Sequence, residues 1–329
     1  MKTFLLVVLL FCFLTSSNVA KPVHLYVFFN MERRRISEAS FLETKQFEGA
    51  QLKYTWKELE PEKDRYDFTA VRNDLAFLTS KGKKLFVQLQ DASFSKENIL
   101  VPKYLLSEQY HGGVAPQYDI QNDNEATAQV AGWVARRWDP LVQERFHKLL
   151  NALGKEFDGS IAGINLPETS IGFGDSGKLF PVGYSNEAYR DAIVVNMKAL
   201  KKAFPKSIVI QYANFMPGEW LPGDDKAFLK TVYKEAVTAG VGVGGPDLLP
   251  FRRGQNNHSY PLIKAAAGIV PTGVAVQDGN YADKNKEGKR LSVSELLAFA
   301  KEQLQVDYVF WCTEEPYYSK ELIPFLNGK

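Results

Sequence analysis

The sequence predicts one α/β domain built as a closed (β/α)8 barrel, a ring of eight parallel strands with helices between them. Short apolar runs alternate with longer segments of helical periodicity along the 329 residues, and eight such runs can be identified. We find no internal repeat, low-complexity tract or linker, so one domain is the economical interpretation. An open, doubly wound sheet is the alternative fold.

The first twenty residues are typical of a secretory signal peptide. Lys2 gives a positive start, 5–14 is an apolar run too short to span a bilayer comfortably, and small residues lead to Ala20. We therefore expect cleavage after Ala20, a mature barrel domain of 21–329, and a secreted or periplasmic location without an integral membrane span. An uncleaved anchor helix is the alternative.

Charge and residue counts narrow the possible partners and cofactors. A formal net charge of +2 argues against a nucleic-acid partner, which would require a marked basic excess. After cleavage Cys312 would have no second cysteine, so the core must stabilise the fold without an internal disulfide. The four histidines fit no metal motif, and the G-x-G-x-x-G match at 240–245 runs into prolines instead of opening a helix. We expect no metal and no other cofactor.

The expected strands are short apolar runs, most of them followed by turn-forming or polar residues. In chain order they are 24–29, 50–56, 85–89, 161–166, 207–213, 241–243, 273–277 and 306–311.

The expected helices show 3.6-residue periodicity and recognisable stop signals. Helix 67–80, for example, places Val71, Leu75 and Leu78 on one side and ends at Gly82. The others are 40–47, 125–157 with a break near 139–140, 186–204, 225–239, 260–267 and 292–305. Between the third strand and helix 125–157 lies a long excursion, 92–124, which we expect to be a functional or mobile loop.

The strongest functional signal lies in the stretch 161–169, which reads I-A-G-I-N-L-P-E-T. Its first six residues suit a strand buried on both faces, and Glu168 follows immediately after Pro167. A carboxylate just beyond the C-terminal end of a parallel strand lies where a (β/α)8 barrel builds its active site. The alternative is an ordinary solvated loop acid.

A second motif follows the second strand. Residues 56–68 read W-x-x-L-E-P-x-x-x-x-Y-D-F, and together with a Glu closing strand four they resemble the clan A glycoside hydrolases. These are (β/α)8 enzymes that include β-galactosidase, cellulase and β-mannanase families. The resemblance extends over most of the mature chain through strand order. It implies that Glu168 is the acid/base catalyst and makes Trp56 a candidate sugar-binding residue.

The sequence departs from the clan pattern at two strand ends. The clan acid/base usually follows an Asn, whereas Pro167 precedes Glu168 here, so Asn165 is the candidate for recognising a sugar hydroxyl. The clan nucleophile is a Glu at the end of strand seven, but this strand ends in V-Q-D-G-N, without a Glu. Asp278 is therefore the expected second carboxylate, with Glu314 after strand eight as the alternative.

Two carboxylates are needed because one must donate a proton to the leaving oxygen while the other attacks or activates water. The structural alternatives are a plain turn residue for Asp278 and a solvated helix start for Glu314. By the same resemblance Trp311, at the end of strand eight, is expected to floor the sugar site; core packing is its alternative. Asp247 and His258 are further candidates for binding substrate, and a surface-loop role is the alternative for His258.

The sequence thus predicts an exported glycoside hydrolase that cleaves an oligo- or polysaccharide. One rival is a non-catalytic carbohydrate-binding barrel that has lost its nucleophile. Another is a uronate-acting lyase, for which the arginine runs 33–35 and 252–253 would matter, although a solvated charge run is the simpler explanation for them. The sequence leaves the oligomeric state open.

Overall fold

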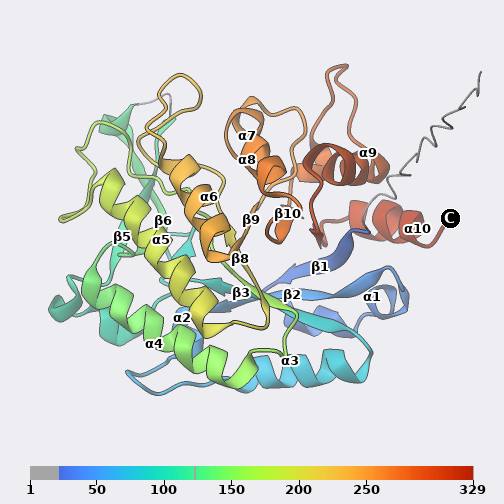
Figure 1. Cartoon of the computed structure of the whole chain (residues 1–329), viewed down its shortest axis with the longest axis horizontal. Helices are drawn as coiled ribbons and strands as arrows, with labels where there is room; N and C mark the ends of the chain where they lie inside the picture. Colours follow the sequence, from blue (N-terminus) through green and yellow to red (C-terminus); the bar gives the residue numbers. More distant parts are fainter. Residues whose placement is uncertain (1–21, 122–123, 329) are drawn as a thin grey trace, which may run out of the picture.

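The computed structural model describes residues 22–121 and 124–328, and its central feature is a closed barrel of eight parallel strands (Figure 1). The strands follow one another around the barrel in chain order, which confirms the predicted (β/α)8 fold. They are β1 (His24–Asn30), β2 (Phe47–Thr55), β3 (Lys84–Gln90), β7 (Gly163–Leu166), β8 (Ile208–Tyr212), β9 (Gly242–Gly245), β10 (Thr272–Val276) and β11 (Tyr308–Cys312). The expected signal peptide, 1–20, lies outside the described residues.

Helices surround the barrel, and their ends agree with the capping signals in the sequence. Asp139 caps the first turn of α4 with Pro140 at its start, and Ser185 caps α5 through the backbone N–H of Ala188. The helices are α1 (Ala39–Glu43), α2 (Trp56–Leu59), α3 (Thr69–Ser80), α4 (Pro140–Phe157), α5 (Asn186–Ala203), α6 (Phe228–Ala239), α7 (Arg253–Asn257), α8 (Ser259–Ala266), α9 (Val293–Ala298) and α10 (Ile323–Leu326).

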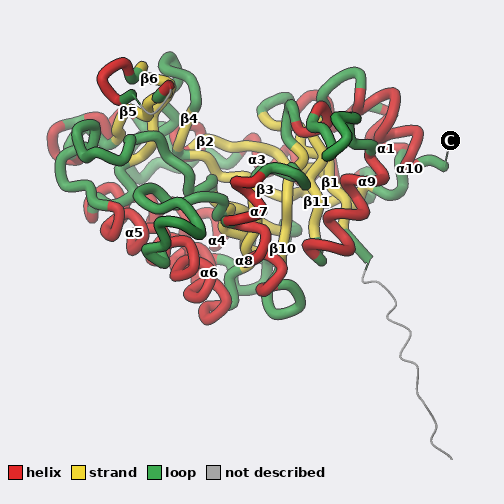
Figure 2. The backbone as a smooth tube through the Cα atoms, turned by 90° about the horizontal axis from the view of Figure 1, so that it is seen from above, coloured by secondary structure: helices red, strands yellow, loops and turns green. Residues whose placement is uncertain are grey.

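The expectation of a helix through 125–157 is wrong in its first half. Residues Gln129–Ala135 form strand β6, which pairs antiparallel with β5 (Val114–Asp119) and β4 (Ala92–Ser93). Valine and tryptophan favour an extended chain here, and a Cβ on Gly132 would lie 1.9 Å from the carbonyl oxygen of Ser93. The excursion after strand three therefore contains a small sheet of its own, seen at one end of the molecule in Figure 2.

Aromatic side chains from neighbouring strands fill the barrel interior. Tyr26, Phe86 and Phe310 contact one another with ring centroids 4.9–5.8 Å apart, and Tyr308 packs against them. Glycine in β9 permits close strand approach, because a Cβ on Gly244 would lie 1.8 Å from the carbonyl oxygen of Gly273. The glycine run at 240–245 thus serves barrel packing, which accounts for its match to a nucleotide-binding pattern.

The W-x-x-L-E-P motif has a structural role on the outside of the barrel. Trp56 is fully buried against Phe146, and its indole N–H donates to Glu60 at 2.9 Å. The same carboxylate accepts from the backbone N–H of Asp64 at 3.0 Å and from the Arg145 guanidinium. Trp56 has no exposed surface to offer a sugar, which corrects its expected binding role.

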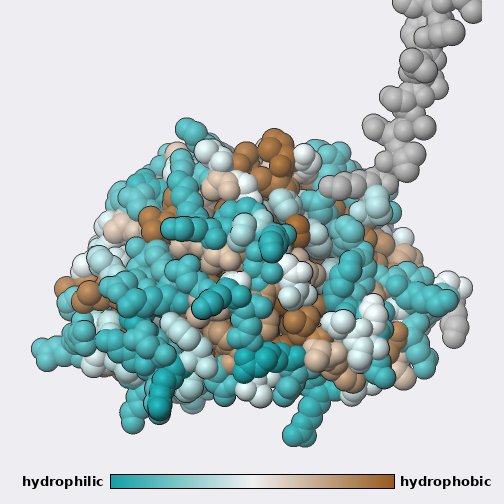
Figure 3. Space-filling model, turned by 60° about the horizontal axis from the view of Figure 1, so that its bottom comes forward, coloured by the Kyte–Doolittle hydropathy of each residue, from teal (hydrophilic) through white to brown (hydrophobic). Residues whose placement is uncertain are grey.

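The surface mixes polar and apolar residues. The face drawn in Figure 3 is mostly hydrophilic, with smaller hydrophobic patches between the polar side chains. Among the large apolar side chains that are exposed are Phe94, just after β4, and Trp220 in the loop after β8. Across the described ranges, no helix combines the length and the apolar character needed to cross a bilayer.

Replacing Glu60 with Ala should destabilise the fold strongly. The change leaves the Arg145 guanidinium without its buried counter-charge and removes the acceptor for the Trp56 N–H. Breaking one side of a buried ion pair costs about 3–5 kcal/mol, so we expect a loss of that size in the free energy of unfolding measured with denaturant. Glu62→Ala, which removes an exposed ion pair with Arg65, is the control and should cost under about 1 kcal/mol. If the two variants lost the same free energy of unfolding, the buried contacts of Glu60 with Trp56 and Arg145 would not have the stabilising role assigned to them.

Candidate active site

The carboxyl ends of the barrel strands bring four ionisable side chains into one site. Lys53 lies on β2, Glu168 follows β7, Asp247 follows β9 and Asp278 follows β10. The charges of Glu168 and Asp278 act on the pKa of Lys53, and the charge of Asp247 acts on that of Glu168. Such mutual effects decay with distance, so these strand ends face a shared space at the active-site end of the barrel.

Glu168 is the acid whose environment most resembles that of a proton donor. Burial raises the pKa of this half-buried carboxyl from 4.5 to about 7, and the negative charge of Asp247 adds to the rise. The hydrogen bond from Asn214, at 2.6 Å, opposes it, as do the charges of Arg137 and Lys53. Near neutral pH, both the protonated and the ionised form of Glu168 are therefore accessible, as a general acid/base requires.

The backbone on either side of Glu168 is fixed by side chains from three other segments. Gln211 donates to the carbonyl oxygen of Pro167 at 2.8 Å, and Arg137 donates to that of Glu168 at 3.0 Å. Tyr189 donates its hydroxyl to the carbonyl oxygen of Thr169 at 3.1 Å. Three consecutive carbonyls thus have defined partners, which restricts where the Glu168 side chain can point.

Arg137 is the centre of this arrangement. Its guanidinium forms a two-pronged pair with Asp91, with N–O distances of 2.9 and 2.6 Å, and also donates to the Tyr189 hydroxyl at 2.7 Å. Both Arg137 and Asp91 are buried. A buried guanidinium is tolerated only where its N–H groups have acceptors, and here the carbonyl of Glu168 is one of those acceptors.

Lys53 supplies positive charge between two carboxylates. Burial lowers the pKa of its ammonium group, while Glu168 and Asp278 oppose that shift. The ammonium also lies 5.6 Å from the ring centroid of Phe28. Lys53 in turn favours the ionised form of Glu168, because its positive charge lowers the pKa of that carboxyl.

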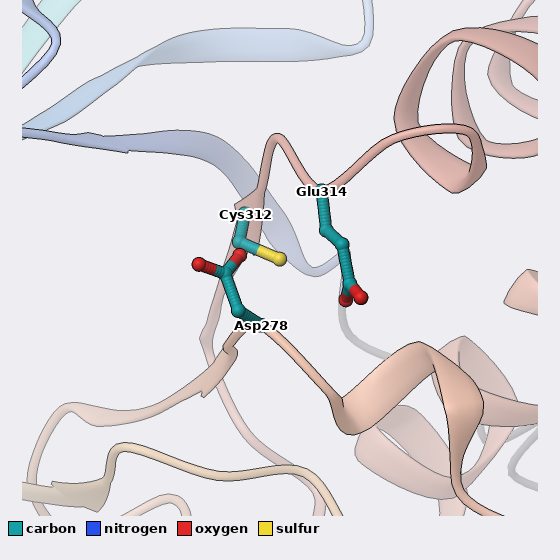
Figure 4. A group of neighbouring side chains, drawn as sticks. All are labelled: Asp278, Cys312 and Glu314. Carbon is teal, nitrogen blue, oxygen red and sulfur yellow. The ribbon is translucent and has the colours of Figure 1, made fainter.

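Asp278, Cys312 and Glu314 form a second cluster where β10 and β11 end. One ligand atom from each lies within 4.8 Å of the others, and Figure 4 shows the Cys312 sulfur pointing into the space between the other two side chains. A cavity of about 400 Å³ opens here, lined also by Met31 and Arg35. Asp278 itself is in an exposed turn, and Glu314 accepts from the backbone N–H of Gly279 at 2.8 Å.

These three residues are the donors that a metal could use among the described parts of the chain. A metal binds the thiolate form of cysteine, however, and burial raises the pKa of the Cys312 thiol far above its ordinary range. The donor set therefore fits a metal poorly.

Three of the expected substrate-binding residues are buried in supporting roles. Asn165 is inside the barrel, where its side-chain oxygen accepts from Gln51 at 2.9 Å. Trp311 has no exposed surface and stacks on Tyr281 with centroids 6.1 Å apart, so it does not floor a sugar site. His258 is neither a hydroxyl binder nor a surface residue: its Nε2 accepts from the N–H of Leu221 at 2.9 Å within the fold.

Asp247 remains a candidate because it is half-buried near Glu168. Burial raises its pKa, although Asn280 donates to its carboxylate at 3.2 Å. The sequence reasoning missed Lys53, Asn214 and Arg137, which contact or influence Glu168 from distant segments. Asn214 could have been found, since it is the polar residue directly after the predicted fifth strand.

The chain folds as a (β/α)8 barrel with carboxylates beyond the carboxyl ends of several of its strands. No protein-family model matches the sequence, and no curated protein matches it.

Solved structures of glycoside hydrolases share the fold at low sequence identity. Xylanase 10B from Thermotoga petrophila RKU-1, in complex with xylobiose, is 14% identical over 88% of this chain and 82% of its own, with a TM-score of 0.52. Xylanase Xyn10A from Cellvibrio japonicus is 10% identical over 94% and 99%, with a TM-score of 0.54. A β-galactosidase from Halorubrum lacusprofundi is 11% identical over 88% of this chain but only 52% of its own, with a TM-score of 0.54. At these identities the likeness establishes the fold.

Glu168→Gln should stabilise the protein at high pH. The pKa of Glu168 is about 7 in the folded state against 4.5 ordinarily, so the folded state binds the extra proton between these values. Stability contributed by that proton is present below pH 4.5 and is lost as the pH rises through 7. In denaturant unfolding, we expect the free energy of unfolding of the variant to be higher than that of the parent at pH 8 and equal to it near pH 4. The exposed Glu315→Gln change is the control; an advantage of Glu168→Gln that is independent of pH would refute the assignment.

Changes to the two neighbours should move the pKa of Glu168 in opposite directions. Asn214→Ala removes a hydrogen bond to the ionised carboxylate and should raise the pKa, whereas Asp247→Asn removes a negative charge and should lower it. Carbon-13 NMR titration of labelled glutamate carboxyl groups measures both shifts. If both changes moved the pKa of Glu168 in the same direction, a group other than Asn214 and Asp247 would control that pKa.

Proposed function

We propose that the protein is an exported glycoside hydrolase that cleaves a glycosidic bond in an oligo- or polysaccharide by carboxylate acid/base catalysis. The observation that carries the proposal is the pKa of Glu168, about 7, at the carboxyl end of the fourth barrel strand. A carboxylic acid that is protonated near neutrality can donate to the glycosidic oxygen as the bond breaks.

In the proposed reaction, Glu168 transfers its proton to the leaving oxygen, and the sugar leaves with the bonding electrons on that oxygen. Asp278 acts as the second carboxylate: it either attacks the anomeric carbon or takes a proton from an attacking water. Asp247 favours the protonated form of Glu168 before the reaction, because its negative charge raises the pKa.

The second carboxylate also determines stereochemistry. A separation of about 5–5.5 Å from the acid suits a covalent, retaining route, and about 6.5–9.5 Å admits a water and inverts the centre. Asp278 is one methylene shorter than the clan's Glu, which favours the wider gap and inversion. Glu314 is the alternative second carboxylate, since it lies within the same cluster as Asp278.

A non-catalytic carbohydrate-binding barrel is the second candidate function, and the absence of a Glu in the sequence V-Q-D-G-N at the end of strand seven favours it. The uronate lyase has weaker support. Arg33 is paired with Glu58, and Arg35 with Glu38, so neither guanidinium is left uncompensated for a substrate carboxylate.

Glu168→Gln and Asp278→Asn should each reduce turnover at least about a hundredfold, the scale of lost acid/base catalysis. The assay screens the purified mature protein against aryl glycosides and plant or microbial polysaccharides. Activity of the parent should fall as the pH rises through about 7, because Glu168 then loses its proton. Glu315→Gln, an exposed acid bonded to Ser319, is the matched control and should stay active.

Two outcomes would revise the proposal. If Asp278→Asn kept full activity while Glu314→Gln abolished it, the second carboxylate would be Glu314. If no substrate were cleaved and both variants bound sugar as well as the parent, the binding barrel would be correct.

A further inference from the structure

The loop after β8 carries an aromatic surface that the proposed chemistry does not use. All five tryptophans lie in the described residues, and Trp220 is the exposed one, with 55% of its surface accessible. Its ring is parallel to that of Phe215 within 2°, with centroids 5.8 Å apart. We call these two side chains the Trp220 platform.

The Trp220 platform is braced from below. His258 lies under both rings, with centroids 4.6 Å from Trp220 and 4.9 Å from Phe215. Its Nε2 accepts from the N–H of Leu221, and its Nδ1 donates to the carbonyl oxygen of Gly254 at 2.8 Å. Burial lowers the pKa of His258, which is consistent with a neutral imidazole in this bracing position.

The backbone around the platform is also fixed. Trp220 and Asp224 exchange two backbone hydrogen bonds of 2.9 and 2.8 Å. Glu219 is buried and accepts from the N–H groups of Phe228 and Leu229, at 2.9 and 2.7 Å, at the start of α6. An exposed indole that is prevented from folding onto its own surface is pre-organised for a ligand, because little entropy is lost on binding.

The platform is connected to the segment that carries the catalytic acid. The Thr169 hydroxyl donates to the carbonyl oxygen of Phe215 at 2.6 Å, and the neighbouring Asn214 donates to the Glu168 carboxylate. The loop that presents Trp220 therefore begins beside Glu168.

We propose that the Trp220 platform is a sugar-binding subsite for an oligo- or polysaccharide, taking a unit some distance from the bond that is cleaved. An indole face carries partial negative charge and attracts the slightly positive C–H groups on the flat face of a pyranose with equatorial hydroxyls. This inference rests on the proposed function and narrows it to chains of several equatorially substituted units, as opposed to a single terminal sugar.

The test measures binding of oligosaccharides of increasing length to the full mature protein in the Glu168→Gln background, so that nothing is hydrolysed. Isothermal titration with β-1,4-linked xylo- and gluco-oligosaccharides of two to six units is the probe. We expect Trp220→Ala to weaken binding of the longest oligosaccharides about tenfold and to weaken binding of the disaccharide less. Trp220→Phe, which keeps an aromatic face, should recover most of the affinity.

Phe94→Ala is the matched control, because Phe94 is an aromatic residue with 65% exposure that lies on a different segment, just after β4. It should leave oligosaccharide affinity unchanged, and denaturant unfolding should show that each variant is folded. Undiminished affinity of Trp220→Ala for every length would overturn the subsite, as would binding to none of the probes. A dimer of the parent that Trp220→Ala converts to monomer would overturn it in favour of a self-association surface.

The outcomes separate this inference from the proposed function. Binding that depends on Trp220 in a parent that cleaves nothing would retain the subsite and reject the hydrolase. Cleavage by the parent, combined with unchanged affinity in Trp220→Ala, would support the hydrolase and reject the subsite.

Discussion

The buried pair of Asp91 and Arg137 is the interaction on which the site depends. Neither residue is chemically reactive in the proposed scheme, but Arg137 distributes its N–H groups among Asp91, Tyr189 and the carbonyl of Glu168. A guanidinium buried in this way is costly unless all its contacts are made together. The pair therefore connects the end of β3, helix α5 and the segment after β7. These connections fix the position of the Glu168 backbone.

At the strand ends, opposing influences act on the pKa of Glu168. Burial and Asp247 favour the neutral form of Glu168, while Asn214, Arg137 and Lys53 favour the charged form. The result is a carboxyl poised near neutrality instead of one fixed in either state. The pKa of Lys53 is also set by opposing effects, since burial disfavours its charged form whereas the carboxylates of Glu168 and Asp278 favour it. An acid of this kind could be identified only from the folded arrangement.

The barrel and Glu168 were predictable because strand periodicity, stop signals and the placement of a strand-end carboxylate are local properties. The strand β6 was missed because its pairing with β4 and β5 is a long-range contact that local periodicity does not reveal. Trp56, Asn165 and Trp311 were assigned to the site through the clan resemblance, yet all three are buried, because the direction of a side chain at a strand end depends on register. Trp220 was missed since nothing in its sequence neighbourhood distinguishes an exposed indole from a core one.

The small sheet of β4, β5 and β6 has a consequence for protein engineering. Asp91 is the residue just before the excursion and Arg137 lies just after it, so the ion pair closes a long loop at its base. The entropy of closing such a loop rises only slowly with its length. The insert also contacts the rest of the fold between these two residues, since Lys57 donates its backbone N–H to the carbonyl oxygen of Leu100 at 2.9 Å and Arg145 donates to the Tyr104 hydroxyl at 3.0 Å. A foreign segment grafted between Asp91 and Arg137 would therefore have to replace these contacts, while the ion pair at its base keeps the contacts that orient Glu168.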